Sequence, residues 1–313
     1  MAAPIVLAAA AVAAVLCPGA VAFVDTGTGT MTSTVSLPGD GLALFAAPDG
    51  RVVVPLASQE ATAVVAASGT VERWRGRLFP MFFADFDRMH VVLPGELATL
   101  SYPERVPLVR IPLPFATGAR RAACSADGRL VAVVPPGPEG ASLTLVAALE
   151  GGTTTSVRLG GGATALAIAP AGEFAVVATG RGVVEVAGAG RPRAIGTLDV
   201  GGEVRVLGIT ADGRTVLVGT ARAGGGEIVG VRVDLAAKAP LKERFRTALP
   251  GAVAALSADD DEVAAVAGDG VVVLSADGKK VRRKLAIDGA SDVKLLPKRA
   301  LTAVPEWSEG RTP

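Results

Sequence analysis

A short phrase built around Asp-Gly recurs seven times along the chain. It is clearest as SADGRLVAVV at 125–134, APDGRVVVPL at 47–56, TADGRTVLVG at 210–219 and SADDDEVAAV at 257–266. Weaker copies are FDRMHVVLP at 86–94, APAGEFAVVA at 169–178 and LPKRALTAV at 296–304. Aligned on the Asp, the copies fall at positions 49, 87, 127, 171, 212, 259 and 297, which are 38 to 47 residues apart. A repeat of this length is typical of one four-stranded blade of a β-propeller.

Each copy is predicted to form a hairpin between two strands. Apolar runs flank the Asp-Gly pair, in which Gly tolerates a positive φ and Asp hydrogen-bonds to its own backbone. A second hairpin follows in each unit and is clearest in GVVVLSADGKKVRRKLAID at 270–288. We expect no helix after residue 22, and an all-β, seven-bladed β-propeller that forms a single domain over residues 23–313.

Two strands are left over at each end of the chain. FVDTG at 23–27 and MTSTVSL at 31–37 precede the first copy, and SDVKLL at 291–296 and ALTAV at 300–304 surround the last one. We expect the N-terminal strands to pair with the C-terminal strands and so close the ring. Closure of this kind pairs backbone groups that would otherwise be left without partners.

The phrase S-A-D-G-R-x-V-A-V resembles the repeat of bacterial YVTN-type and TolB-type seven-bladed propellers, and the resemblance spans roughly residues 23–305. The Gly-His and Trp-Asp signatures of WD-repeat propellers are absent from the sequence. Because such propellers include scaffolds, ligand binders and some enzymes, the resemblance implies a fold and no particular activity.

The first residues, MAAPIVLAAAAVAAVLCPGAVAF, are apolar and carry no charged side chain. With Ala20 and Ala22 at the −3 and −1 positions, residues 1–22 are predicted to be a secretory signal peptide that is cleaved before Phe23. The mature protein would then be periplasmic or extracellular, with no membrane span. One alternative is an uncleaved N-terminal anchor, although Pro18 and Gly19 leave the apolar run short for a bilayer. The other alternative is that the protein stays in the cytoplasm.

Composition limits the chemistry. The formal net charge is +1, from 31 basic and 30 acidic residues, whereas a nucleic-acid binder would carry a clear basic excess. With one histidine, His90, and one cysteine, Cys124, after cleavage, we expect no cofactor and no metal, and we interpret both residues as structural. The acidic run from Asp259 to Glu262 is interpreted as a solvated hairpin tip, with a carboxylate calcium site as the alternative.

Two surfaces are candidates for binding. In a propeller, the connections between blades and those between second and third strands emerge on the same face, the loop face. The charged residues expected near the tunnel mouth on this face are Asp40, Arg77, Arg120, Arg121, Glu203, Arg205, Asp288 and Asp292. A basic rim is predicted on the fourth strands of two blades, with Lys238, Lys242, Arg244 and Arg246 in one cluster and Lys279, Lys280, Arg282, Arg283 and Lys284 in the other. Rim charges discourage edge-to-edge aggregation; alternatively they could contact anionic lipid, polysaccharide or an acidic protein. We expect the loop face, and not the rim, to carry the interaction.

Three functions agree with these observations. The first is a secreted or periplasmic non-catalytic interaction module that recognises another envelope or extracellular protein. The second is a propeller enzyme, such as a lyase, lactonase or carboxylate-dependent hydrolase, with acids and Arg at the tunnel mouth. The third is a structural subunit of an envelope or appendage assembly. Nothing in the sequence sets the oligomeric state.

Overall fold

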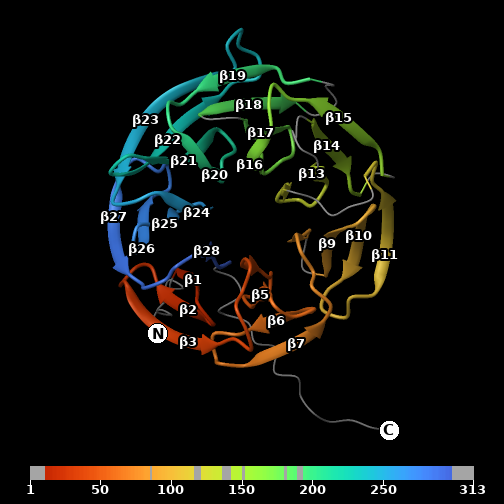
Figure 1. The fold of residues 1–313 in the computed structure, drawn as a ribbon, viewed down its shortest axis with the longest axis vertical. Coiled ribbons are helices and arrows are strands. Elements are labelled where there is room, and N and C mark those ends of the chain that lie inside the picture. Colours follow the sequence, from red (N-terminus) through yellow and green to blue (C-terminus); the bar gives the residue numbers. More distant parts are fainter. Residues whose placement is uncertain are drawn as a thin grey trace, which may run out of the picture.

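The computed structural model describes residues 11–84, 87–115, 121–135, 142–149, 152–179, 182–188 and 193–297. Their regular secondary structure consists of 28 β-strands in seven four-stranded sheets, and all strand pairs within the sheets are antiparallel. The sheets are arranged radially around a ring (Figure 1). The prediction of an all-β, seven-bladed propeller is therefore confirmed.

Six blades are continuous in sequence. In all six the strands follow one another in sequence order from the centre of the ring outward (Figure 1). Their strands are β4 (Phe45–Ala46), β5 (Val52–Pro55), β6 (Ala61–Val65), β7 (Val71–Arg75); β8 (Met81–Phe83), β9 (Arg88–Leu93), β10 (Glu96–Ser101), β11 (Pro107–Pro112); β12 (Arg121–Cys124), β13 (Leu130–Val134), β14 (Ser142–Ala147), β15 (Thr154–Arg158); β16 (Ala163–Ile168), β17 (Phe174–Thr179), β18 (Val183–Gly188), β19 (Gly196–Asp199); β20 (Glu203–Ile209), β21 (Thr215–Arg222), β22 (Gly225–Val233), β23 (Leu241–Leu249); and β24 (Val253–Ala258), β25 (Glu262–Ala267), β26 (Gly270–Ser275), β27 (Val281–Ala286).

The seventh sheet, here called the closing blade, joins the two ends of the chain. Its strand order is β28 (Asp292–Leu295), β1 (Val12–Cys17), β2 (Ala20–Asp25), β3 (Thr30–Ser36). The pairing of β1 with β28 confirms closure by N-terminal and C-terminal strands. The expected division of two strands from each end is wrong, because three strands come from the N-terminal side. The apolar run at 12–17 pairs with β28, and the predicted strand at 300–304 lies outside the described residues.

The closing blade includes residues that we expected to be removed with a signal peptide. All of β1 and half of β2 precede Phe23, and Ala13, Ala14, Val15 and Leu16 are at most 2% exposed. A chain cleaved before Phe23 could not form this sheet as the structure has it. In the part of the chain described here, no helix is long and apolar enough to cross a membrane.

The core lies between neighbouring sheets and is built mainly from Val, Ala and Leu. Along β1 the side chains alternate between two interfaces. Leu16 packs with Val52 and Val54 of the next blade, and Val15 packs with Val266 of the preceding blade. Alternation of this kind is what a strand buried on both faces requires.

The recurring Asp-Gly phrase forms the turn between the first and second strands. In the blade of β12 to β15, Ser125 Oγ donates to Asp127 Oδ1 over 2.6 Å, and the same oxygen accepts from the Arg129 N–H over 3.0 Å. Gly128 follows with φ of +68°. Thr210 with Asp212 repeats this geometry, and Ser275 with Asp277 repeats it in the turn between β26 and β27, the third and fourth strands of their blade. In the clearest copies a hydroxyl, a carboxylate and a glycine in this order stabilise the turn, while copies such as APDG at 47–50 and APAG at 169–172 form it without the hydroxyl.

Candidate functional site

The loop face is the face of the ring on which the innermost strands begin. Of the eight residues predicted there, Arg120 lies outside the described residues. Arg121, Glu203 and Asp292 are the first residues of β12, β20 and β28, and Arg205 follows within β20. Asp40, Arg77 and Asp288 lie on the connections that precede β4, β8 and β28. The topological placement is thus as expected, while a binding role stays a prediction.

Most of these side chains already have partners within the protein. Asp292 Oδ2 accepts the backbone N–H of Leu44 over 2.8 Å and so links the closing blade to the next one. Arg205 pairs with Glu203 over 2.9 Å, and Arg121 Nε donates to the carbonyl of Thr164 over 3.1 Å. Much of the charge on this face therefore stabilises loops and blade contacts.

A buried carboxylate at the start of β22 organises a network that sequence inspection missed. Glu227 is 8% exposed, and its Oε1 lies 2.6 Å from Arg222 Nη2 and 2.5 Å from Arg246 Nη1. Arg246 also donates to Glu243, and this hydrogen bond raises the pKa of the Arg246 guanidinium despite partial burial. Arg246, predicted as part of the basic rim, is therefore neutralised. The sequence signal was a pair of opposite charges, Arg222 before and Glu227 after the Gly-rich hairpin at 223–226.

Five of the remaining eight cations of the basic rim lie on two neighbouring outer strands, as predicted, and three lie in turns and not on the strands. Lys242 and Arg244 are on β23, and Arg282, Arg283 and Lys284 are on β27; Lys238, Lys279 and Lys280 lie in the turns that precede these strands. Figure 1 shows β23 and β27 one after the other along the outside of the ring. All eight are exposed except Arg283, which is half-buried.

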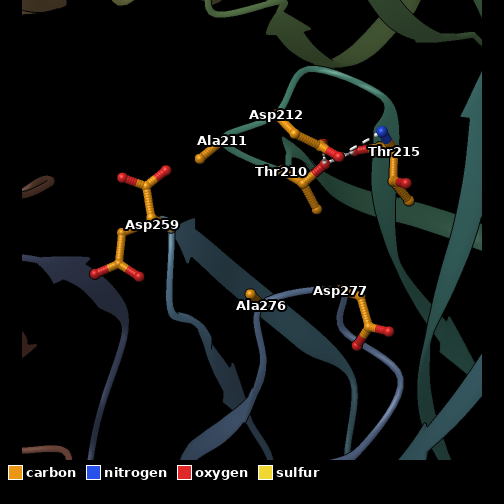
Figure 2. Close-up of a pocket in the computed structure, with 8 residues that line it drawn as sticks. Thr210, Ala211, Asp212, Thr215, Asp259, Ala276 and Asp277 are labelled. Atoms are coloured by element: carbon orange, nitrogen blue, oxygen red, sulfur yellow. Dashed lines mark hydrogen bonds between the residues drawn. The ribbon is translucent and has the colours of Figure 1, made fainter.

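The face opposite the loop face carries a pocket of about 210 Å³, here called the turn-face pocket. It lies among three hairpin turns of two neighbouring blades, as Figure 2 shows. Its lining residues are Thr210, Ala211, Asp212, Thr215, Asp259, Asp260, Ala276 and Asp277. Residues 259–261 of the acidic run form a hairpin tip, as interpreted from the sequence, whereas Glu262 begins β25 and is buried.

The carboxylates of the turn-face pocket hold the turns on which they lie. The hydrogen bond from Thr210 lowers the pKa of Asp212, and the one from Ser275 lowers the pKa of Asp277. Asp259 Oδ1 accepts the N–H groups of Asp261 and Glu262, both over 2.8 Å. Carboxylates with lowered pKa values stay ionised at neutral pH and are poor proton donors. Among the described residues, no group of three or more His, Cys, Asp and Glu side chains could hold a metal ion.

His90 and Cys124 have structural environments. His90 on β9 is fully buried; its Nδ1 lies 2.9 Å from Thr99 Oγ1, and its Nε2 lies 2.8 Å from the carbonyl oxygen of Gly128 in the next blade. Burial raises the pKa of the Cys124 thiol to about 12, and Asp127 adds to the shift. These environments agree with a structural role for both residues, which stays an interpretation from the sequence.

The fold is shared with solved proteins whose sequences are distant. No protein-family model and no curated protein matches the chain. A functionally unknown protein from Desulfotomaculum acetoxidans DSM 771 is 15% identical with a TM-score of 0.70, over 91% of this chain and 98% of that one. The β-propeller domain of Cps50 (Swd1) from Myceliophteria thermophila is 12% identical with a TM-score of 0.62, over 79% and 86%.

Hydrazine synthase from Kuenenia stuttgartiensis is also similar, with 12% identity and a TM-score of 0.64 over 82% of this chain and 89% of that one. At these identities the similarity is one of architecture, and function must be argued from the surfaces of this chain. The chain has the fold of a seven-bladed β-propeller.

Proposed function

We propose that the protein is a non-catalytic interaction module, a rigid propeller that binds a partner protein through its surface. The observation that carries the proposal is the unequal pairing of surface charge. Cations on the loop face are engaged by carboxylates and carbonyl groups of the protein, whereas several cations of the basic rim have no such partner among the residues that the structure describes. An unpaired cluster of like charge is available to a partner of opposite charge.

The buried polar groups support a non-catalytic role. His90 is enclosed between Thr99 and Gly128, and Glu185 accepts hydrogen bonds from Thr179 and from the Gly160 N–H. A general acid or base must reach a substrate, and these groups instead connect strands. The YVTN-type or TolB-type subtype belongs to the proposal and is supported by the S-A-D-G-R phrase.

The proposal includes retention of residues 12–22 in the functional chain. This is supported by the burial of β1 and by its pairing with β28, from Ala13 with Leu295 to Leu16 with Asp292. Export from the cytoplasm stays a prediction. Edman sequencing and the intact mass of the protein from its native cells test both points. A chain that begins at Phe23 would contradict retention.

Site-specific photocrosslinking tests the interaction function and the surface that it uses. We would place benzoylphenylalanine at Arg205 on the loop face, at Arg244 on the basic rim and at Asp260 beside the turn-face pocket, one position at a time, in native cells. We propose the basic rim in place of the loop face expected from the sequence, and therefore expect one defined protein adduct from Arg244 and none from Arg205. Adducts from Arg205 alone would move the site to the loop face, and no adduct from any position would contradict the function.

A further inference from the structure

The outer strand β23 differs from the other outer strands in length. It has nine residues, while β3 has seven, β11 and β27 have six, β7 and β15 have five and β19 has four. It is the last strand of its sheet, hydrogen-bonded to β22 on one side, and no described strand pairs with its other edge. Such an edge presents backbone N–H and C=O groups over about 30 Å.

The side chains of β23 alternate between packing and exposure. Leu241, Thr247 and Leu249 are buried, whereas Lys242 and Arg244 are exposed. Neither cation has an ion pair among the residues that the structure describes. A register shift lies where Val231 pairs with Glu243 and Gly230 with Phe245, so Arg244 stands at a bulge.

Positive charge continues from β23 onto the neighbouring β27. Thr247 Oγ1 of β23 donates to the carbonyl oxygens of Gly278 and Lys279 over 3.0 and 3.1 Å, and the Lys279 ammonium lies 5.8 Å from the centre of the Phe245 ring. These contacts fix the two strands relative to one another. Lys280 and Lys284 also lack ion pairs within the described part of the chain.

The charge of this flank contrasts with that of the whole protein. The segments 234–249 and 276–286 contain nine of the 31 Lys and Arg residues but three of the 30 Asp and Glu residues. With a net charge of +1 overall, the rest of the chain is acidic. A field of one sign on one flank selects partners of opposite charge and orients their approach.

We infer that the free edge of β23 binds an acidic, extended segment of a partner protein, which adds to the blade as a fifth strand. The inference rests on the proposed interaction function and names its site and partner class. A polypeptide strand can use both features of the edge, the unpaired backbone groups and the cations at alternate positions. A membrane or a polysaccharide would use the charges alone.

The same features select against a second copy of this chain. Pairing of two β23 edges would bring Lys242 and Arg244 of both copies together, and like charges on adjacent strands are destabilising. The bulge and the lysine protect the edge from neutral strands, as edge strands require. An acidic segment overcomes this protection because its carboxylates neutralise the cations.

Selection from random twelve-residue peptides displayed on phage tests the inference with the full-length protein. We expect the selected peptides to be enriched in Asp and Glu at alternate positions. Binding to the K242E/R244E variant should fall at least tenfold, measured by fluorescence anisotropy. The matched control is R73E/R75E, which reverses two exposed cations on β7, another outer strand. Its binding should stay within twofold of the unmodified protein, and circular dichroism should show that both variants are folded.

Strand addition has a signature of its own. A selected peptide that is N-methylated at alternate amides should lose its binding, and the bound peptide should slow amide hydrogen exchange in β23. Selected peptides without acidic residues, or equal binding to K242E/R244E, would overturn the inference. Equal binding of the N-methylated peptide, or binding of heparin or phosphatidylserine vesicles with no peptide selected, would also overturn it. Peptides that bind at the loop face would overturn this site while leaving the interaction function standing.

Discussion

The closing blade and the blade before it, β24 to β27, have the same four-stranded sheet but are assembled differently. In the earlier blade, short turns join every strand to the next. In the closing blade no turn joins β28 to β1; the two strands pair at four positions between residues 13–16 and 292–295, and the Ser291 and Leu296 N–H groups add hydrogen bonds to Leu16 and Val12. The ring is therefore closed by non-covalent contacts between the two ends of the chain. The strands β1 and β2 are consequently needed to complete the fold, although they lie near one end of the chain.

Deletion of residues 1–22 should have the largest effect. The deletion removes β1 and half of β2, including the buried Val15, Leu16 and Val21. Burial of each such side chain contributes about 1.5–3 kcal/mol, and their sum approaches the total stability of about 5–15 kcal/mol of a typical protein. We expect loss of cooperative thermal unfolding, measured by circular dichroism.

The control for this deletion is removal of residues 1–10, which leaves β1 intact. It should preserve a cooperative transition. If the chain that begins at Phe23 unfolds at the same temperature as the full chain, the closing blade does not need β1, and a cleaved signal peptide becomes compatible with the fold.

Asp292→Ala should have a smaller effect on the same blade. The substitution removes the acceptor of the Leu44 N–H, and Leu44 is fully buried. A buried donor without a partner costs about 1–3 kcal/mol. Asp292→Asn retains an oxygen acceptor and should recover most of the loss in a urea titration. Equal stability of the two variants would contradict this role and return Asp292 to the candidate binding residues.

The positions of the turns could be predicted from the sequence because their signal is local. Asp49, Asp127, Asp212 and Asp259 each lie between an innermost strand and the second strand of its blade, as the alignment predicts. The hydroxyl two residues before Asp127 and Asp212, and the glycine after each, complete a turn without help from distant residues.

The strand β1, which completes the closing blade, was harder to predict because a signal peptide and a strand buried on both faces are both continuous apolar runs. The distinguishing feature was Pro18-Gly19. In the structure these two residues connect Cys17 to its partner Ala20, and Gly19 has φ of +63°. A two-residue turn between two apolar runs of strand length is typical of a hairpin, whereas a single helical segment has no need of one.

The position of the basic rim on the outer strands could be predicted from the sequence, but the ion pairs that its cations make could not. Alternate residues along an outer strand are exposed, so Lys242 and Arg244 could be placed on the rim from sequence. Whether a cation is neutralised depends on distant partners. Arg246 pairs with Glu227, 19 residues earlier, across the two strands β22 and β23. The register of the sheet shows that this cation is engaged, whereas Lys242 has no ion pair with any residue that the structure describes.

The buried Glu262, at the contact between the closing blade and its neighbour, should make the stability of the protein depend on pH. It is 6% exposed and accepts a hydrogen bond from Thr26. Burial raises its pKa; nearby Asp259 and Asp25 act in the same direction, while the Thr26 hydrogen bond and Arg282 oppose the shift. The folded protein therefore holds this proton more tightly than the unfolded chain does. Stability should fall as the pH rises from the ordinary glutamate pKa through the raised one.

Glu262→Gln stays neutral at every pH and retains an acceptor for Thr26. Relative to the unmodified protein, its melting temperature should therefore rise between acid and neutral pH, and the difference should disappear below the ordinary glutamate pKa. Glu104→Gln, at an exposed position between β10 and β11, serves as the control. A difference between Glu262→Gln and the unmodified protein that does not vary with pH would contradict the burial argument.

The smallest effect on stability is expected from K242E/R244E, the variant that should have a large effect on binding. Exposed substitutions away from packed contacts usually change stability by less than about 0.5 kcal/mol. Because these cations repel others on the same flank, the change should be a slight gain at low salt. The gain should vanish near 1 M NaCl, where the screening length is about 3 Å. A loss above about 1 kcal/mol in urea titrations would show that the two cations stabilise the rim. The flank would then resemble the closing blade, as a part of the scaffold and not a surface kept free for a partner.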